Sequence, residues 1–466
     1  MPSIAKAGRV GSKRRLATSS VPDYARNGGT VEGVWMFIRH GDRTPGRCLS
    51  TPKWRDKEAS FWITKLPSPT TAYVADRLNQ SFPVNRLGSD PQQFIDVARN
   101  PFGFLTSKGL CQLNEQGRRF SQRYQTLGLH KPCGEQSPND FLSTWDARVY
   151  ATNYLRTVLS VQSFLSGFLG IEENTVSQSV AERTHDPSMT KEACPLSEDL
   201  GLSNEHTLIP VMVRPLDEDP LNAFDRNPEL VASLSTEVMT SAEFVDGDSS
   251  AAPLATRLAN MLPGLVKRRG NDYAAQSPSG INWVEASDHF VCRSSHDIPL
   301  ARFSQHENDD RIEQTLQALA HPTLAHLAWR FQQWYGNQKL LAEIAAPPLR
   351  EVANQILNAT GPNADERKPF VVYSCHDITI LGLLYGIGAE FLEESEGKEE
   401  IDTGMTRYWP PYASNLVFEL VRLDDAEGNR TKSEPSHIVR VLLNGESSSI
   451  PLEAISHHLR LHKVNL

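Results

Sequence analysis

The stretch Ile38-Arg39-His40-Gly41-Asp42-Arg43-Thr44-Pro45 follows directly on an apolar, β-rich run over residues 31–38. Such a run predicts a buried strand, and the polar residues after it predict a functional loop at the strand's carboxyl end. Chemistry at the carboxyl ends of strands is typical of α/β proteins. The stretch therefore predicts an α/β fold with a site at the end of its first strand.

The same stretch places two guanidinium groups around one imidazole. Arg39 and Arg43 are permanently charged, and their forked donors match the oxygens of a phosphate group. Gly41 lets the backbone approach closely, and Pro45 stiffens the exit from the loop. A histidine held between such arginines, here His40, is suited to attack phosphorus.

A second strand, turn and helix lie far along the chain. Residues 369–374 form a β-rich run, Cys375-His376-Asp377 follows, and the apolar pattern from residue 378 to about 385 predicts a helix. A rival His-Asp pair, His296-Asp297, also follows an apolar stretch. Two segments therefore compete as partners of the first loop.

Other elements complete an α/β pattern. We expect helices from Thr106 and over residues 154–169, and strands over 147–152, 415–421 and 438–443. Residues 194–358 are mostly helical in pattern, whereas residues 48–100 are rich in Pro, Ser and Thr and predict little regular structure. The helical stretch is where an inserted domain is expected.

Length and composition narrow the class of protein. A chain of 466 residues predicts a large domain with a second or inserted one. Its 47 basic and 56 acidic residues give a net charge of -9, which argues against nucleic acid as a partner. No apolar run approaches the length of a membrane span, so no integral membrane segment is expected. Six cysteines without a Cys-x-x-Cys pair argue against zinc-ribbon and thioredoxin-type sites.

The amino-terminal segment, residues 1–30, is basic. Lys6, Arg9, Lys13, Arg14 and Arg15 precede the first acidic residue, Asp23, and no apolar core of a signal peptide is present. This composition resembles a mitochondrial presequence, but a basic tail on a cytoplasmic protein has the same composition. The expected localisation is mitochondrial or cytoplasmic.

The motifs together resemble those of the histidine acid phosphatases, branch 2 of the histidine phosphatase superfamily. The first loop matches the family's Arg-His-Gly-x-Arg-x-Pro signature, and Ser374-Cys375-His376-Asp377 resembles its second signature. Leu105-Thr106-x-x-Gly109-x-x-Gln112 is a further match. The segments that begin at Arg156-Thr157 and at Trp409-Pro410-Pro411-Tyr412 resemble the lysophosphatidic acid phosphatase-like subgroup.

The resemblance implies a fold and a domain organisation. It implies an α/β core whose mixed, largely parallel sheet is flanked by helices, interrupted by a mainly helical cap. The core would comprise residues 31–194 and 346–466, and the cap residues 195–345. The cap would shape the choice of substrate.

The resemblance also assigns roles. His40 would be the nucleophile, Arg39, Arg43 and His376 would hold the phosphoryl group, and Asp377 would protonate the leaving oxygen. Because Asp377 must carry a proton at that step, an acidic optimum is expected. No cofactor or metal is implied. His296-Asp297 resembles a separate family segment outside the active centre, so a structural role is expected for His296.

One family position departs from the pattern. Members usually carry a third phosphate-binding arginine six residues before the Arg-Thr pair, and this chain has Tyr150 there. Arg148, two residues earlier on the same strand face, and Arg156, at the start of the next helix, are both candidates for the missing role.

The expected activity is hydrolysis of a small-molecule phosphomonoester through a phosphohistidine. Lysophosphatidic acid or another lipid phosphate is the first expected substrate. Inositol polyphosphates are the second, because residues 216–259 are acidic and apolar rather than basic. A catalytically silent phosphate-ligand binding protein and a phosphate-transferring mutase are the alternatives on the same fold. The oligomeric state stays open.

Overall fold

The computed structural model describes residues 29–67, 78–88, 93–126, 138–170, 209–222, 224–266, 280–362, 366–388, 409–423, 437–444 and 446–451. Its centre is an eight-stranded sheet of order β2-β4-β3-β5-β1-β6-β7-β8. The strands are β1 (Gly29–Arg39), β2 (Val84–Arg86), β3 (Trp145–Ala151), β4 (Val211–Val213), β5 (Lys368–Cys375), β6 (Asn415–Leu423), β7 (His437–Leu443) and β8 (Glu446–Pro451).

The sheet is mixed, with its parallel part at the centre. β1 pairs with β5, β5 with β3, β3 with β4 and β4 with β2, all in parallel. β6, β7 and β8 extend the other side of β1 through antiparallel pairs. The carboxyl ends of β1 and β5 therefore lie side by side, which is where α/β proteins build their sites.

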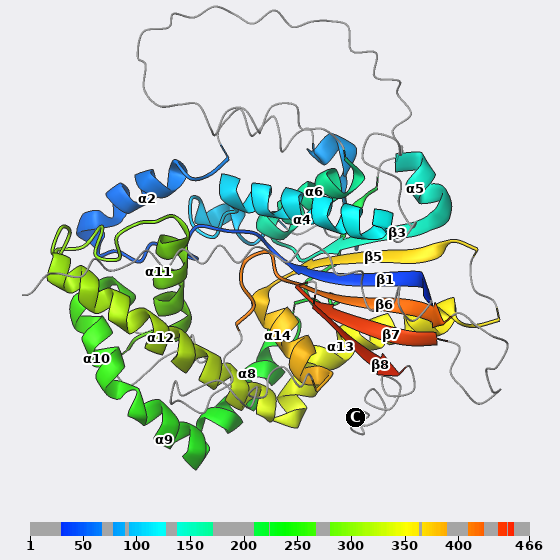
Figure 1. The fold of residues 1–466 in the computed structure, drawn as a ribbon. Helices are drawn as coiled ribbons and strands as arrows, with labels where there is room; N and C mark the ends of the chain where they lie inside the picture. Colours follow the sequence, from blue (N-terminus) through cyan, green and yellow to red (C-terminus); the bar gives the residue numbers. More distant parts are fainter. Residues whose placement is uncertain are drawn as a thin grey trace, which may run out of the picture.

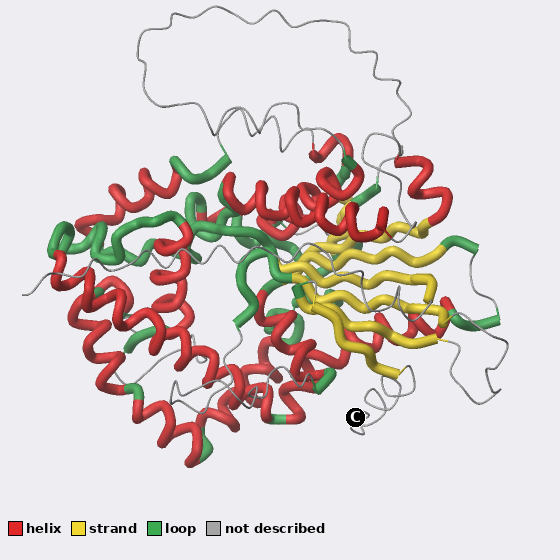
Figure 2. Tube along the Cα trace, viewed as in Figure 1, coloured by secondary structure: helices red, strands yellow, loops and turns green. Residues whose placement is uncertain are grey.

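Helices cover both faces of this sheet (Figures 1 and 2). Even-numbered residues of β1, such as Met36, belong to the buried cluster that includes α4 (Ser107–Thr126) and α6 (Leu155–Leu169). In the same part of the strand, the odd-numbered Trp35 and Phe37 belong to the cluster that includes α13 (Gln338–Ala359) and α14 (Asp377–Gly386). This alternation follows from the two-residue period of a strand and accounts for the near-continuous apolar sequence of β1.

A second, helical region lies beside the sheet (Figure 1). It contains α2 (Arg55–Ile63), α8 (Pro228–Met239), α9 (Ala242–Ser250), α10 (Ala252–Met261), α11 (Trp283–Ser295) and α12 (Asp310–Gly336). Short 3-10 turns occur at Pro52–Trp54, Val97–Arg99 and Pro263–Leu265, and α5 (Pro138–Thr144) precedes β3.

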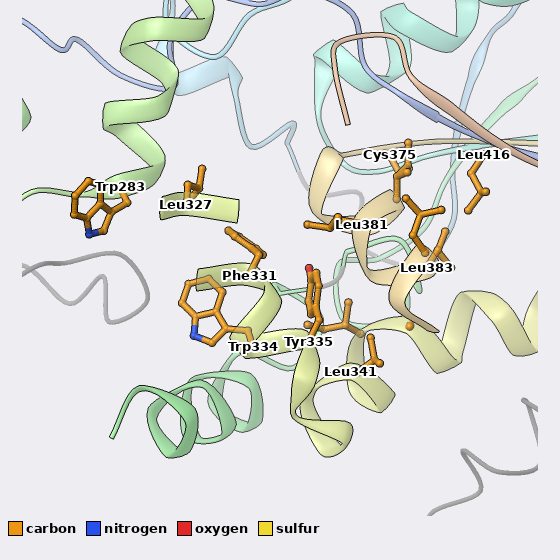
Figure 3. Close-up of a cluster of buried hydrophobic side chains, with 14 of the residues drawn as sticks. Trp283, Leu327, Phe331, Trp334, Tyr335, Leu341, Cys375, Leu381, Leu383 and Leu416 are labelled. Carbon is orange, nitrogen blue, oxygen red and sulfur yellow. The ribbon is translucent and has the colours of Figure 1, made fainter. Parts of the chain in front are cut away.

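One hydrophobic cluster joins the helical region to the sheet. Trp283 of α11 and Phe331 of α12 belong to the same buried cluster as Leu381 of α14 and Leu416 of β6 (Figure 3). Burial of this continuous apolar surface stabilises the placement of the helices relative to the strands. The helical region is thus fixed beside the carboxyl end of β1 and is able to supply residues to a site there.

The α/β fold with a mixed, mostly parallel sheet and an additional helical region is confirmed. One detail of the prediction is wrong: residues 48–100, expected to have little regular structure, contain α2. There Glu58 of α2 accepts hydrogen bonds from the backbone N–H groups of Leu49 and Ser50, so a buried carboxylate orders a Pro- and Ser-rich segment.

The expected domain boundaries stay predictions. The boundary at residues 194 and 195 lies outside the described residues, as do residues 1–28 of the basic amino-terminal segment. The boundary at residues 345 and 346 falls inside α13, which runs through it as one helix. None of the described helices is both long enough and apolar enough to cross a membrane.

Candidate active site

The parallel pairing of β1 and β5 brings the two sequence motifs together. Arg39 is in register with Cys375, and the backbone N–H of His40 donates to the carbonyl of Cys375 over 3.1 Å. The rings of His40 and His376 consequently lie edge to face, with 5.5 Å between their centroids. Two segments more than three hundred residues apart in sequence thus form one site.

The His40 imidazole has one free nitrogen. Its Nδ1 lies 2.8 Å from the Gly41 carbonyl oxygen, which only accepts, so Nδ1 carries the proton and donates. Nε2 is therefore the unprotonated nitrogen. Burial, followed by the charges of Arg156 and Arg39, lowers the pKa of His40 well below its ordinary value. The ring stays neutral, as a nucleophile must.

Close backbone packing sets the position of this loop. A Cβ atom at Gly41 would lie 2.4 Å from the carbonyl oxygen of Gly109 in α4. The backbone N–H of Gly41 also donates to the Ser160 hydroxyl of α6 over 3.1 Å. The expected need for glycine is confirmed, because any side chain here would push His40 away from the helices that hold it.

Arg39 connects His40 to Asp377. Its guanidinium lies 2.6 Å from an Asp377 carboxylate oxygen and donates to the Pro410 carbonyl over 2.5 Å. The ring of Tyr412 lies against the same guanidinium, 4.4 Å from its central carbon. The Trp409 indole N–H donates to Asp377 over 3.2 Å. The segment that starts at Trp409 therefore holds both partners of the ion pair.

Arg43 is held from the helical region. Its two terminal nitrogens donate to the two carboxylate oxygens of Asp288 in α11 over 3.0 and 2.8 Å. Such bidentate pairing fixes the plane of a guanidinium. Asp288 also accepts from the backbone N–H of Gly46 over 3.0 Å, which ties the end of the loop to α11.

Arg156 lies at the first turn of α6 and reaches His376. One terminal nitrogen lies 3.5 Å from His376 Nδ1, and another lies 3.6 Å from the carboxylate of Asp96. Asp96 also accepts from the backbone N–H groups of Leu155 and Arg156, so it caps the helix from a separate loop. Its buried carboxylate positions the arginine that projects from this helix end.

A hydroxyl relay orients His376. Thr157 donates to the Tyr154 carbonyl over 2.8 Å, so its oxygen accepts from Thr152, 2.9 Å away. Thr152 must then accept from His376 Nε2–H over 3.1 Å, which leaves Nδ1 facing Arg156 as an acceptor. Burial, together with the charges of Arg156 and Arg43, lowers the pKa of His376 well below its ordinary value.

Asp42, in the same loop, is the centre of a separate hydrogen-bond network. Asp42 is fully buried and accepts from His296 Nε2–H over 2.7 Å, from the Ser295 hydroxyl and from Thr106. Burial alone would raise the pKa of Asp42, but these hydrogen bonds hold it below its ordinary value. The His296 ring is therefore hydrogen-bonded to Asp42, whereas the His376 ring lies edge to face with His40.

The structure brings together His40, Asp377, Arg39, Arg43, His376 and Arg156. It does not bring Arg148 to them: this residue pairs with Asp146 of its own strand, and its side chain is 49% exposed, against 12% for Arg156. The expectation that Arg148 joins the phosphate site is therefore corrected. Arg148 lies three residues before the end of β3, too far from the strand's carboxyl end, where His40 lies.

Tyr150 does not reach the site as a replacement for arginine. Its ring stacks on Tyr373, with 5.4 Å between centroids, and the guanidinium of Arg214 lies over it at 4.1 Å. It therefore packs among residues of the sheet and of the segment after β4. Of the two candidates, Arg156 is the one whose guanidinium lies beside His376.

Sequence reasoning missed the side chains that orient the arginines. Asp96 and Asp288 lie in segments without any recognised motif, and Thr152 was read only as the end of a strand. A weak signal existed for Asp96, because α6 has no capping side chain at Tyr154 and its first N–H groups need acceptors from elsewhere. Within the described residues, no three His, Cys, Asp or Glu side chains are grouped to hold a metal ion.

Comparisons with known proteins bear on the family and the fold of this chain. Residues 30–236 and 281–444 match the family model described as histidine phosphatase superfamily (branch 2). No curated protein sequence matches the chain. A multiple inositol polyphosphate phosphatase of Bifidobacterium longum in complex with inositol hexasulfate shares the fold, with a TM-score of 0.50, 13% identity, and coverage of 93% of this chain and 89% of that one.

The phytase of Klebsiella sp ASR1 is also similar, with a TM-score of 0.47, 14% identity, and coverage of 93% of this chain and 96% of the phytase. At these identities the solved structures bear on the fold alone. The family match covers most of the chain and includes both motifs that the sheet brings together. The chain therefore belongs to the histidine phosphatase superfamily, branch 2, and is a phosphatase.

Proposed function

We propose that this phosphatase hydrolyses phosphomonoesters through a phosphohistidine on His40. Nε2 of His40 attacks phosphorus, the ester P–O bond breaks, and Asp377 gives its proton to the leaving oxygen, so an alcohol departs. Water then attacks the phosphohistidine and returns a proton to Asp377. Inorganic phosphate leaves, and His40 regains its lone pair.

One observation carries this proposal: three buried guanidinium groups surround His40 with unused donors. The Nε atoms of Arg39, Arg43 and Arg156 are buried, and none has a hydrogen-bond partner in the described part of the chain. A buried donor without a partner costs about 1–3 kcal/mol. A tetrahedral oxyanion beside Nε2 of His40 would supply acceptors to all three and neutralise their charge.

The ion pair of Arg39 with Asp377 links binding to proton donation. A phosphoryl group competes with Asp377 for Arg39, because both are anions that bind the same guanidinium. Once Arg39 turns to the phosphoryl oxygens, the carboxyl group is free to hold the proton that the leaving oxygen needs. The neutral His40 ring remains a nucleophile in mildly acidic solution, because its pKa is lowered.

A lightly charged substrate such as lysophosphatidic acid or another lipid phosphate is the first choice. Two further arginines have carboxylate partners: Arg47 pairs with Glu285, and Arg226 with Glu343. Next to Asp377, the Trp409 ring packs edge to face on Phe331, with 5.0 Å between centroids. Paired cations and an aromatic wall at the leaving-group side favour an apolar alcohol over further phosphates.

An inositol polyphosphate is the second choice, and Arg99 favours it. Burial, followed by Arg43 and then Arg99 among the nearby cations, lowers the pKa of Arg156, so Arg99 lies near the site. Arg99 is also exposed. An exposed cation whose charge acts on Arg156 suits a second phosphate group on the substrate.

A substrate panel tests these proposals. Inorganic phosphate release is measured from lysophosphatidate, inositol hexakisphosphate, a sugar phosphate and an aryl phosphate at one pH. We expect lysophosphatidate to exceed inositol hexakisphosphate in kcat/KM. The reverse order, with selective loss of inositol hexakisphosphate turnover in Arg99→Gln, would establish the second choice. Transfer of phosphate to another alcohol without release would indicate a mutase.

The His40→Ala variant tests the intermediate. It should lose turnover by at least about a thousandfold on every substrate, because no other group can form the covalent intermediate. Acid-quenched wild-type enzyme should carry phosphate that is stable to alkali and labile to acid, and the variant should carry none. Near-normal activity of His40→Ala would refute the mechanism.

A further inference from the structure

Asp377, which donates the proton in the proposed reaction, is held on both of its carboxylate oxygens. Its Oδ1 accepts from the backbone N–H of Ile378 over 2.9 Å. Its Oδ2 has two neighbours: a terminal nitrogen of Arg39 lies 2.6 Å away, and the Trp409 indole N–H donates over 3.2 Å. Among the described residues, the carboxylate therefore has one charged partner and two neutral donors.

The three partners respond differently to a bound phosphoryl group. Arg39 binds anions, so a phosphoryl group competes with Asp377 for it. The N–H of Ile378 belongs to the first turn of α14, and the Trp409 ring packs edge to face on Phe331, with 5.0 Å between centroids. Helix geometry and ring packing hold these two neutral donors in place while Arg39 turns away.

The Trp409 N–H thereby determines where Oδ2 takes up a proton. Trp409 and Arg39 share the two lone-pair positions of this carboxylate oxygen. When Arg39 leaves, the indole N–H keeps its position, so the proton occupies the position that Arg39 held. That position points toward the phosphoryl group, because the phosphoryl group binds the same guanidinium.

The same hydrogen bond opposes proton uptake by Asp377. A donor to an ionised carboxylate favours the ionised form. A general acid acts only while it is protonated in the substrate complex, so kcat falls as pH rises and the acid ionises. Removal of the indole N–H makes proton uptake easier and should therefore move this alkaline limb of the kcat profile to higher pH.

We infer that Trp409 is a positioning residue for the general acid: its indole N–H orients the Asp377 carboxyl group and sets the alkaline limit of turnover. The role belongs to the N–H group and not to the packing of the ring. The inference rests on the proposed role of Asp377 in proton transfer and assigns a residue that acts through it.

The other titratable groups around Asp377 do not produce such a limb. Arg39, from β1, is permanently charged. Burial, followed by the charge of Asp377, raises the pKa of Tyr335 of α12 well above its ordinary value. Burial also raises the pKa of Cys375 and lowers the pKa of His376. None of these four neighbours changes charge between about pH 6.5 and pH 9.

The variant Trp409→Phe tests the inference, because it removes the N–H and keeps an aromatic ring on Phe331. For an alkyl phosphate, the alkaline limb of kcat should move up by about half a pH unit to one unit. On the acidic side of that limb, kcat should fall by about threefold to tenfold, because the carboxyl group loses its orientation. An aryl phosphate should keep its wild-type profile. KM and inhibition by inorganic phosphate should change less than about twofold.

Trp334→Phe is the matched control. Trp334 also packs on Phe331, with 4.7 Å between centroids, and its buried indole nitrogen has no partner in the described part of the chain (Figure 3). This variant should keep the wild-type limb on both substrates. The same shift in Trp334→Phe would assign the effect to packing and overturn the inference.

Asp377→Asn, measured alongside, separates the inference from the proposed function. Equal losses on alkyl and aryl phosphates would refute the general acid and the inference with it. Selective loss on the alkyl phosphate in Asp377→Asn, with a wild-type limb in Trp409→Phe, would overturn the inference alone.

Nuclear magnetic resonance of the unaltered protein gives a readout that does not depend on turnover. With inorganic phosphate bound, one indole N–H resonance among those of the eight tryptophans should shift with falling pH as Asp377 takes up its proton. That resonance should not shift with pH in Asp377→Asn. The absence of a resonance that titrates in the wild type, or an unchanged titration in Asp377→Asn, would overturn the inference.

Discussion

Two His-Asp pairs contact different residues of the same loop. His376 lies beside His40 on the phosphate side, with its neighbour Asp377 on Arg39. His296 donates to Asp42 on the other side. The dipeptides are identical, so residue type alone does not separate a catalytic pair from a supporting one.

What separates the pairs is the element that carries each of them. His376 directly follows β5, a parallel strand in register with β1, and is the N-cap residue of α14. This places its ring at the shared carboxyl edge of the sheet. His296 follows the last residue of α11, and Asp297 after it has a left-handed backbone with φ of 53°. At the end of α11, His296 contacts Asp42, whereas Asp288 within the same helix contacts Arg43.

Substitution of the two aspartates is expected to give the largest difference in activity between the pairs. Asp377→Asn should slow an alkyl phosphate by about a hundredfold to ten-thousandfold, because its leaving group needs a proton. An aryl phosphate with a good leaving group should lose far less. Asp297→Asn should change kcat on either substrate less than about twofold, since Asp297 is not placed at the site. Equal losses on both substrates in Asp377→Asn would refute the general-acid role.

The arginine beside His376 gives the next largest effect. Arg156→Gln should raise KM and the inhibition constant of inorganic phosphate together, by about tenfold to a hundredfold, because a charged hydrogen bond to phosphate is lost. Arg148→Gln is the matched control and should change neither, since its partner is Asp146. Normal phosphate inhibition in Arg156→Gln would mean that the site uses Arg39 and Arg43 alone.

Substitutions of the two histidines should have different kinds of effect, one on catalysis and the other on stability. His376→Asn should lower kcat/KM by about tenfold with little change in stability, because it removes the partner of Arg156. His296→Asn should instead lower the free energy of unfolding by about 1–3 kcal/mol, because buried Asp42 loses a donor. Steady-state kinetics and urea denaturation of both variants separate the roles. A stable His296→Asn protein with greatly reduced kcat would reverse their assignment.

The sequence was sufficient for the catalytic strand and its partner. β1 and β5 carry unbroken apolar runs that end in charged motifs, and parallel pairing then requires the motifs to meet. The meeting of the two motifs, which carry His40 and His376, was predictable for this reason, and the catalytic roles of their residues stay predictions. The choice of His376 over His296 rested on the resemblance of their segments to two different family motifs, and it stays a prediction.

The supports of the arginines were not predictable in the same way. Asp96 and Asp288 act from a loop and from a helix that no motif links to the site, and only tertiary packing brings them to Arg156 and Arg43. Arg148 was a reasonable candidate because strand alternation puts it on the same face as Tyr150. Its distance from the carboxyl end of the strand mattered more than the face on which it lies. A residue three positions before the carboxyl end cannot serve a site beyond that end.

The smallest expected effect is on the pH dependence of folding stability. The pKa values of His40 and His376 lie well below the ordinary value of about 6.5 in the folded protein, so the unfolded chain binds more protons as pH falls below that value. The stability that these neutral rings contribute is complete above about pH 6.5. It is lost as pH falls toward their lowered values, by up to about 1.4 kcal/mol for each ring and pH unit.

The Tm of the unliganded wild type should therefore fall by a few degrees between pH 7 and pH 5. The His40→Ala, His376→Asn double variant should show a shallower fall, because it lacks both buried rings. His321→Gln, which removes an exposed histidine of α12, should show the same fall of Tm with pH as the wild type. Inorganic phosphate should reduce the fall in wild type, since an anion beside the rings compensates the nearby guanidinium charges and makes protonation less costly. Identical slopes in the double variant and the wild type would show that other groups, Asp42 among them, dominate the acid sensitivity of this fold.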